Sequence, residues 1–490
     1  MGRTSVYFVI FTLAVFALLL LEAPILPGTE ANTALESLNR TSTDAISGDY
    51  APVPLVMQQV SRMLTQSDMP FALRLPSVIV YLGVLGIWYF AAQRILGREY
   101  VRLTMLVAVS IPGLMVFAKL ATADIWLAVA MLLLYLSTVW YLKAPHPRWL
   151  VSWAAAFLLG AAAHFGYTVL FSGVLIGLIS WRHAQGRQLL QPLFGGVAVV
   201  AGLLLYIGEW SLWPTDGFYT GWSGSLGPIG QVGIGLLGMG SWLFFLPAAL
   251  VFVYRRWRAG EELSMLLAAG FIAALITGTI GWWVFGVLLV AKQAQLYFSA
   301  AYPLTDWVKA TSALVVIATA MLSMLALLSG FTMLGAEPFR AIAGTLGLYF
   351  ALQFVAVLGV YSANRRMLLG GAIFSGIGLV FMLSARLLPV LPSDALVYDR
   401  LAKAVTEVEP SSLTLQLPDA QEAVPLYYES VITLATPVAH DRAATALPRP
   451  LTAPVVVRDT AGLDLPGFVQ VRSFSDGSRS DSLYFFLLLP

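Results

Sequence analysis

Residues 27–77 form a polar stretch between two apolar spans, and the rest of the chain is interpreted outward from it. The stretch contains Pro27-Gly28-Thr29-Glu30-Ala31-Asn32, a run rich in hydroxyl side chains, Tyr50-Ala51-Pro52-Val53-Pro54-Leu55, and Ala72-Leu73-Arg74-Leu75-Pro76-Ser77. Most of the chain before residue 389 is otherwise apolar. Ionisable groups at a membrane are costly, so a carboxylate and an arginine placed there indicate a functional site.

The composition indicates a multi-pass membrane protein. Hydrophobic residues make up 59% of the 490 residues and charged residues only 11%, whereas soluble domains contain roughly 25% charged residues. The sequence contains no run of basic residues of the kind that binds nucleic acid. The absence of cysteine excludes disulfides, thiolate metal sites and cysteine nucleophiles.

Apolar segments of helical length recur through residue 388, and we interpret about thirteen of them as transmembrane helices. The first, 5–26, is expected to be an uncleaved span with its N-terminus inside. Two places interrupt the pattern: the junction between 149–163 and 166–182, and the short span 294–307 that follows 263–290. Irregular backbone at membrane depth is tolerated where it lines a cavity, so both breaks are candidates for an active-site wall.

The placement of lysine and arginine predicts the orientation. Fourteen of the 28 fall in loops that thirteen crossings place on the same side as the N-terminus and only six in the opposite loops, which favours a cytoplasmic N-terminus and an outer C-terminal segment. If span 294–307 does not cross, the three later spans invert and the C-terminal segment moves inside.

The tryptophans Trp282 and Trp283 are most simply interpreted as part of an interfacial belt.

Charges return from residue 389, and short β-rich segments replace the helical runs. We therefore expect a transmembrane domain at 1–388, with its first outer loop at 27–71, and a small soluble α/β domain at 389–490. The predicted strands are 413–417, 424–428, 455–458, 468–471 and 483–488. The last strand is too apolar for an exposed edge, so we expect it inside the sheet or against the membrane domain.

The sequence contains no P-loop, dinucleotide glycine fingerprint, nucleophile elbow or paired-histidine metal helix. Its four histidines are too scattered to predict a zinc site. The remaining candidates are polar residues at the predicted outer ends of spans, namely Glu30, Asp49, Arg74, Lys119, Asp124, His164, Lys292 and Tyr297.

Several of these residues also have a purely structural interpretation. Asp124 can cap a helix N-terminus, and Arg74 can anchor its helix at the membrane surface. Lys119 can simply flank a span, and His164 can be a satisfied buried histidine. Glu30 can be a solvated loop carboxylate.

The order of these motifs resembles the polytopic GT-C glycosyltransferases, especially the aminoarabinose-to-lipid A transferases and the protein O-mannosyltransferases. The resemblance covers residues 1 to about 310. It rests on the acid after span one, Pro52-Val53-Pro54-Leu55, Ala72-Leu73-Arg74-Leu75-Pro76-Ser77, Ala118-Lys119-Leu120-Ala121-Thr122-Ala123-Asp124, and Lys292-Gln293-Ala294-Gln295-Leu296-Tyr297 with Tyr302-Pro303. The resemblance to the bacterial branch implies an inner-membrane protein with a periplasmic C-terminal domain.

The resemblance implies sugar transfer from a polyprenyl-phosphate donor, held in the membrane lipid, to a lipid, glycan or protein acceptor on the outer face. Glu30 and Asp124 are the implied catalytic acids, one of which acts as general base on the acceptor. The implied substrate-binding residues are Arg74, His164, Lys292, Tyr297 and Tyr302. The resemblance implies no definite cofactor, and it leaves open whether a divalent metal ion is bound.

The chain also departs from the family pattern. Thr29-Glu30 stands where an Asp-Glu pair is usual, Ala51-Pro52-Val53-Pro54-Leu55 replaces an acidic-Lys-Pro-Pro-Leu element, and His164-Phe165-Gly166 replaces Thr-Lys-Gly. An inactive homologue serving as an accessory subunit in envelope glycan assembly accounts for these losses. A lipid or sugar transporter is a further alternative, disfavoured because no repeat relates the two halves.

Overall fold

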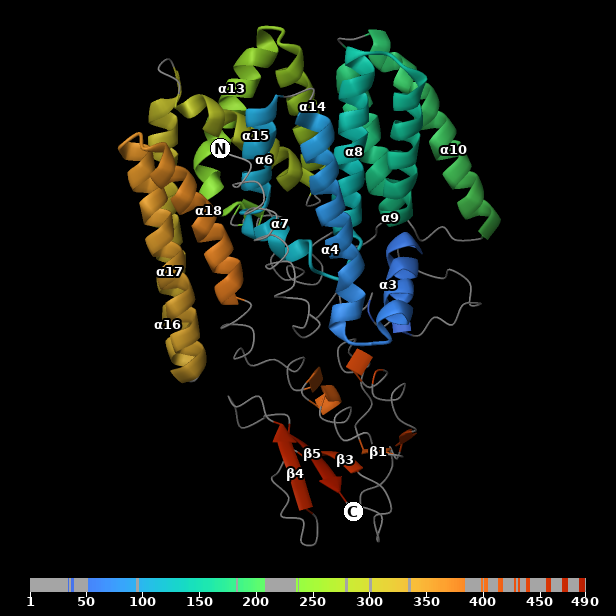
Figure 1. The fold of residues 1–490 in the computed structure, drawn as a ribbon, viewed down its shortest axis with the longest axis vertical. Coiled ribbons are helices and arrows are strands. Elements are labelled where there is room, and N and C mark those ends of the chain that lie inside the picture. Colours follow the sequence, from blue (N-terminus) through green and yellow to red (C-terminus); the bar gives the residue numbers. More distant parts are fainter. Residues whose placement is uncertain are drawn as a thin grey trace.

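The computed structural model describes residues 34, 37–38, 52–93, 97–181, 184–207, 235–236, 238–277, 281–298, 302–333, 336–383, 398–399, 401–403, 413–416, 427–428, 431, 438–440, 455–459, 469–474 and 484–489. The predicted span 5–26, Glu30 and Asp49 lie outside these ranges. The described part consists of a helical bundle and a small sheet (Figure 1).

The bundle is built from long apolar helices and several shorter helical segments. They are α3 Pro52–Thr65, α4 Pro70–Ile87, the π-helix η1 Trp88–Ala92, α6 Arg98–Ala108, α7 Pro112–Phe117, α8 Asp124–Lys143, α9 Pro147–Ser180, η2 Ala184–Leu189, α10 Leu190–Ile207, η3 Gly240–Phe245, α13 Leu246–Arg258, α14 Glu262–Thr277, α15 Gly281–Tyr297, α16 Thr305–Met333, α17 Ala336–Tyr361 and α18 Arg365–Met382.

Within the described residues, six helices are long and apolar enough to cross a membrane. One of them, α16, leaves Leu314, Met321 and Met324 more than 60% exposed. Such an apolar surface fits contact with lipid. The chain is a multi-pass membrane protein.

Helix α9 folds back on itself at His164. The backbone there is non-helical, with φ −156° and ψ 100°. A Cβ added to Gly160 would lie 2.7 Å from Thr168 Oγ1, although eight residues of straight helix span about 12 Å. The two halves of α9 therefore run back along each other, and the predicted break between 163 and 166 is confirmed.

The predicted boundaries around α14 and α15 are wrong. The chain has no single helix over 263–290, because α14 ends at Thr277 and α15 begins at Gly281. The proposed span 294–307 is split between the end of α15 and the start of α16. Only Thr277, Gly278 and Thr279 interrupt the two long apolar runs there, so hydropathy alone did not locate the break. The correction moves a boundary without removing a helix, so it does not invert the later spans.

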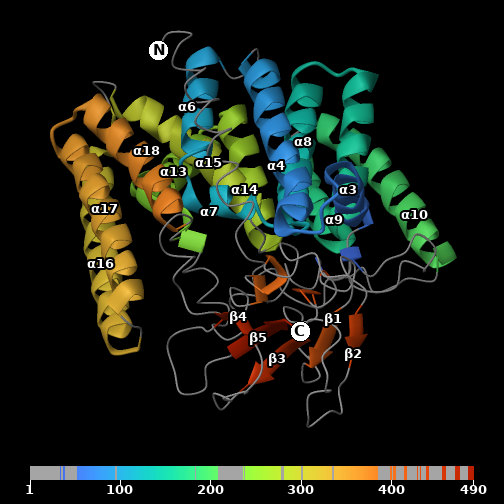
Figure 2. The same cartoon turned by 60° about the horizontal axis from the view of Figure 1, so that its bottom comes forward.

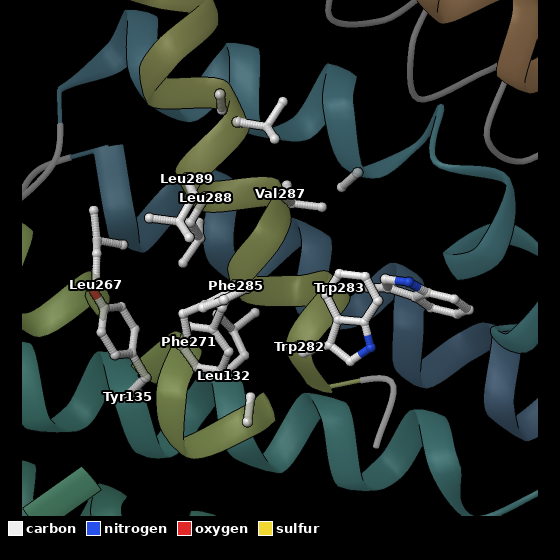
Figure 3. Close-up of a cluster of buried hydrophobic side chains, with 14 of the residues drawn as sticks. Leu132, Tyr135, Leu267, Phe271, Trp282, Trp283, Phe285, Val287, Leu288 and Leu289 are labelled. Carbon is white, nitrogen blue, oxygen red and sulfur yellow. The ribbon is translucent and has the colours of Figure 1, made fainter. Parts of the chain in front are cut away.

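The core centres on α15 (Figure 3). Phe285 packs edge-on against Tyr135 of α8 at a centroid distance of 5.2 Å, and Trp282 packs against Phe271 of α14 at 6.4 Å. Trp282 and Trp283 are only 7% and 1% exposed. The belt interpretation of these two tryptophans is therefore wrong, since both rings are part of the core.

The C-terminal part forms a mixed five-stranded sheet in the order β2-β1-β3-β5-β4. The strands are β1 Leu413–Gln416, β2 Val438–His440, β3 Val455–Asp459, β4 Val469–Phe474 and β5 Tyr484–Leu489. β1 pairs in parallel with β2 and β3, whereas β5 pairs antiparallel with β3 and β4. The apolar β5 is thus an interior strand, as predicted.

Two strand predictions failed. Residues 424–428 were predicted to form a strand, but Tyr427 and Tyr428 are helical and fully buried. Burial of their rings overrides the strand preference of aromatic residues. The short β2 was not predicted. The fold class is nevertheless the expected one, a helical membrane bundle with a small C-terminal α/β part.

The sheet lies beyond one end of the bundle in both views (Figures 1 and 2). We call this end, which carries α3, the start of α4 and the segment 118–124, the sheet-side end. The opposite end, which carries the start of α6 and the end of α15, is called the far end.

Candidate functional site

Three ionisable side chains are buried at the sheet-side end of the bundle. Arg74 in the second turn of α4 is 2% exposed, Lys119 after α7 is 4% exposed, and Asp124 at the start of α8 is 6% exposed. Helices α4 and α8 pack against each other. Burial of a charge is costly unless a partner compensates it, so this end is built around polar interactions.

The short helix α7 and the turn after it place Lys119 and Asp124. Pro112 begins α7, which ends at Phe117, and the Lys119 amide donates to Val116 O at 3.0 Å. Asp124 is the first residue of α8, where the helix dipole favours a carboxylate. Burial lowers the pKa of Lys119 to about 8. The segment thus presents a buried acid and a lysine that titrates near neutral pH.

Helix α3 adds a residue that sequence reasoning missed. Gln58 is 1% exposed, and its Nε2 donates to Ala121 O at 3.2 Å. Gln58 Oε1 and Ser61 Oγ have no hydrogen-bond partner in the described part of the chain. A polar stripe at 58, 61, 62 and 65 repeats at helical spacing and could have revealed α3.

His164 lies at the fold-back of α9, half buried, with its ring 5.6 Å from that of Tyr167. Helix α3 packs against α9, and Figure 1 shows it beside the sheet-side end of that helix. His164 therefore belongs to the same end of the bundle as Arg74 and Asp124.

Lys292, Tyr297 and Tyr302 form a separate group. Lys292 Nζ lies 5.6 Å from the ring centroid of Tyr100. Tyr302 donates to Gln293 Oε1 at 2.6 Å, and Tyr297 donates to Val360 O at 2.8 Å. Each of the two tyrosine hydroxyls thus has a partner within the protein.

This second group lies at the far end. Tyr100 begins the helix that follows α4 and η1, and residues 70–92 span about 33 Å at 1.5 Å per residue. Figure 1 shows the start of α6 and α15 away from the sheet. The structure therefore does not bring Lys292, Tyr297 and Tyr302 together with Arg74 and Asp124.

Asp399 from the C-terminal part approaches Arg74. Burial raises the pKa of Asp399. Lys403 opposes this rise through its hydrogen bond and its charge, and the hydrogen bond from Tyr428 and the charge of Arg74 oppose it further. The Lys403 Nζ to Asp399 Oδ2 distance is 2.8 Å, and Tyr428 donates to Oδ1 at 3.4 Å. No local sequence pattern links Asp399 to Arg74, so sequence reasoning missed it.

Other candidate sites in the described residues are weaker. No group of three histidine, aspartate or glutamate side chains there could hold a metal ion. A cavity of about 50 Å³ between α4, α6, α8 and α15 is lined by apolar groups such as Leu85, Met105 and Val287. Such a cavity cannot satisfy a sugar or a phosphate, so the polar sheet-side end is the candidate site.

The fold defines a class of protein, a multi-pass membrane helical bundle with a small C-terminal α/β part, and solved structures share this fold over nearly the whole chain. One such structure is ArnT from Cupriavidus metallidurans bound to undecaprenyl phosphate, with a TM-score of 0.62 and 14% identity. The same protein in the apo state gives a TM-score of 0.60, also at 14% identity. Both alignments cover 99% of this chain and 98% of ArnT.

No protein-family model matches the sequence, and no curated protein matches it either. At this identity the likeness establishes the fold. It confirms the fold that the sequence motifs implied.

Proposed function

We propose that the protein is an integral membrane glycosyltransferase that moves a sugar from a polyprenyl-phosphate donor to a lipid, glycan or protein acceptor. The observation that carries this proposal is the burial of Arg74, Lys119 and Asp124 at one end of a fold that binds undecaprenyl phosphate in ArnT. Two cations suit a phosphate leaving group, and an acid suits a general base.

In this mechanism an acceptor hydroxyl attacks the anomeric carbon of the sugar. Asp124 or Glu30 takes the hydroxyl proton as the new glycosidic bond forms and the bond from carbon to phosphate oxygen breaks. Arg74 and Lys119 stabilise the charge that develops on the lipid phosphate, and His164 is placed to donate to it. The role of Glu30 is supported by its sequence position between span one and α3.

The same proposal places the protein in a bacterial inner membrane, with its N-terminus in the cytoplasm and the domain at 389–490 in the periplasm. The distribution of lysine and arginine supports this orientation. A reporter fused after residue 388 tests it: periplasmic activity is expected, and a cytoplasmic signal would overturn it.

The direct test is transfer of a labelled sugar from polyprenyl phosphate in membranes that contain the purified protein. At least one of Glu30→Gln and Asp124→Asn is expected to reduce transfer by about 100-fold or more, the size of a general-base contribution. Asp306→Asn is a matched control, because Asp306 is exposed at the far end. The assignment fails if both Glu30→Gln and Asp124→Asn leave transfer intact.

A second candidate function is favoured by the substitutions at Thr29, Ala51, Pro52 and Phe165, where the GT-C pattern carries an acid or a lysine. An inactive homologue acting as an accessory subunit would bind the lipid phosphate without turnover. Saturable binding of undecaprenyl phosphate, together with no transfer to any lipid, glycan or protein acceptor, would favour this alternative.

A further inference from the structure

We propose that the C-terminal domain is a clamp that positions the predicted first outer loop, and that Tyr427 and Asp399 are the residues that dock it. The docking goes beyond the proposed function, and only its effect on sugar transfer rests on that function. The proposal stands on a continuous set of contacts between segments that lie far apart in the sequence.

The first contact joins the C-terminal domain to the turn between α3 and α4. Tyr427 is fully buried, and its hydroxyl donates to Asp68 O at 2.8 Å. Its ring packs edge-on against Tyr428 at a centroid distance of 4.8 Å. A tyrosine combines an apolar body with a polar tip, which suits an interface between two parts of a protein.

The α3–α4 turn is joined in its own right to the predicted outer loop. Arg62 Nε donates to Asp68 Oδ1 at 2.6 Å, and Arg62 Nη1 donates to Ser37 O at 2.5 Å. Ser37 is fully buried and belongs to the same loop as Glu30. The contacts therefore run from Tyr427 through Asp68 and Arg62 to the loop that carries the predicted catalytic acid.

A second set of contacts, within the domain, involves Asp399. Asp399 is 3% exposed, is held by Lys403 and Tyr428, and lies close enough to Arg74 to feel its charge. The rings of Tyr398 and Tyr428 stack beside it at 6.5 Å. Tyr428 links this cluster to Tyr427, because the rings of Tyr427 and Tyr428 pack edge-on, so Asp399 supports the residue that bonds to Asp68.

These contacts give the domain a specific role. A domain tethered only by its linker would leave Ser37 and Arg74 open to solvent. Here the domain is bonded to the α3–α4 turn at Asp68, and Arg62 joins the same turn to Ser37. Tyr427 and Asp399 act through the groups they hold and are therefore positioning residues.

The test uses the absence of cysteine from the natural chain. Ser37→Cys in the full-length protein, reconstituted in lipid nanodiscs, supplies one buried thiol whose reaction with a membrane-impermeant maleimide reports docking. Slow labelling is expected with Tyr427 intact. Tyr427→Phe keeps the ring but removes the bond to Asp68 O, so about tenfold faster labelling is expected.

Two further variants complete the comparison. Asp399→Asn is expected to accelerate labelling as well, because it removes the charge that faces Arg74. Tyr254→Phe is the matched control, since Tyr254 is 52% exposed on α13 and its change should leave the rate as it was. If Tyr427→Phe and Asp399→Asn label no faster than Tyr254→Phe, the clamp is wrong.

Sugar transfer is measured on the same variants. The clamp predicts that Tyr427→Phe lowers kcat about fivefold and leaves the donor KM nearly unchanged, because the loop is misplaced while the lipid site remains. If labelling accelerates but no variant, the parent included, transfers sugar, the glycosyltransferase proposal fails and the clamp stands. If the parent transfers sugar but Tyr427→Phe and Asp399→Asn change neither the labelling rate nor kcat, the clamp proposal fails and the glycosyltransferase proposal stands.

Discussion

The two ends of the helical bundle both bury polar side chains, but they do so in different ways. At the sheet-side end the buried groups are ionisable, namely Arg74, Lys119 and Asp124. At the far end they are neutral: Gln293 and Tyr302 bond to each other, and Tyr297 bonds to a backbone carbonyl. The ion pair between Arg365 and Glu99 at that end is half exposed.

From this difference we infer that the far end mainly stabilises the fold, whereas the sheet-side end is where we expect the reaction. Neutral hydrogen-bonded groups rigidify the fold without the cost of a buried charge. Buried charges are costly, so they persist where a substrate, a second domain or a reaction uses them. Among the described residues, the sheet-side end is therefore where catalytic variants should act.

The largest expected effect contrasts Asp124 with Lys292. If Asp124 is the general base, Asp124→Asn should lower kcat for sugar transfer by about 100-fold or more. Lys292→Gln should change kcat and donor KM less than about threefold, since Lys292 contacts the Tyr100 ring at the far end. Initial rates with a labelled donor measure both. Equal losses in the two variants would remove the distinction between the ends.

Next in size is the effect of Arg74. Arg74→Lys keeps the charge but loses the planar fork that binds a phosphate in two places. The donor KM should rise about tenfold, corresponding to roughly 1.4 kcal/mol of binding. Arg340→Lys serves as the control, because Arg340 is exposed on α17. A KM that is unchanged in Arg74→Lys would assign Arg74 to domain docking rather than to the donor.

A pH effect of intermediate size is expected from Lys119. Burial lowers the pKa of Lys119 to about 8, so its side chain loses its positive charge as the pH rises through that value. The donor KM should therefore rise over this range. Lys119→Arg stays protonated and should remove this limb of the profile. Lys309→Arg, at the far end, should keep the limb.

Stability should move in the opposite direction over the same pH range. The unfolded chain keeps the lysine proton to about 10.5, whereas the folded chain releases it near 8. The unfolded state therefore binds more protons between these values, and Tm should rise with pH there. A Tm that falls between pH 8 and 10 in the parent but not in Lys119→Arg would contradict the assigned pKa.

A smaller effect tests the fold-back that places His164. Gly160→Ala puts a Cβ 2.7 Å from Thr168 Oγ1 and should destabilise the protein by about 1–3 kcal/mol through overpacking. Thr168→Ala removes the clashing atoms, so the double variant should recover part of the lost Tm. No recovery would mean that the two halves of α9 do not pack as described.

The sequence predicted the class of fold because long apolar spans and a change of composition at residue 389 are strong signals. It also predicted the break at His164, where a polar residue interrupts an apolar run. It missed α3, whose prolines Pro52 and Pro54 were interpreted as a turn although proline is tolerated in the first turn of a helix. It missed the break before Gly281 because the short Thr277-Gly278-Thr279 interruption lies between two long apolar runs that were interpreted as one span.

The candidate site was predicted only in part. Arg74, Asp124 and His164 were placed correctly at one end because each follows or begins a predicted span. Lys292 and Tyr297 were grouped with them because an error in one boundary reversed the end to which they were assigned. Gln58 and Asp399 depend on contacts between distant segments, which local patterns do not record.

The smallest effect is expected from the ion pair at the far end. Arg365 Nη2 and Glu99 Oε1 are 3.0 Å apart, but their side chains are 50% and 61% exposed. Solvent screens such a pair, so Arg365→Gln should lower the free energy of unfolding by less than about 1 kcal/mol and leave transfer unchanged. Urea unfolding and initial rates measure the two quantities. Because Arg365 also lies 6.0 Å from the Phe298 ring, Glu99→Gln separates the ion pair from that contact. A loss of transfer in Glu99→Gln as large as that in Asp124→Asn would show that exposed charges at the far end also take part in the reaction.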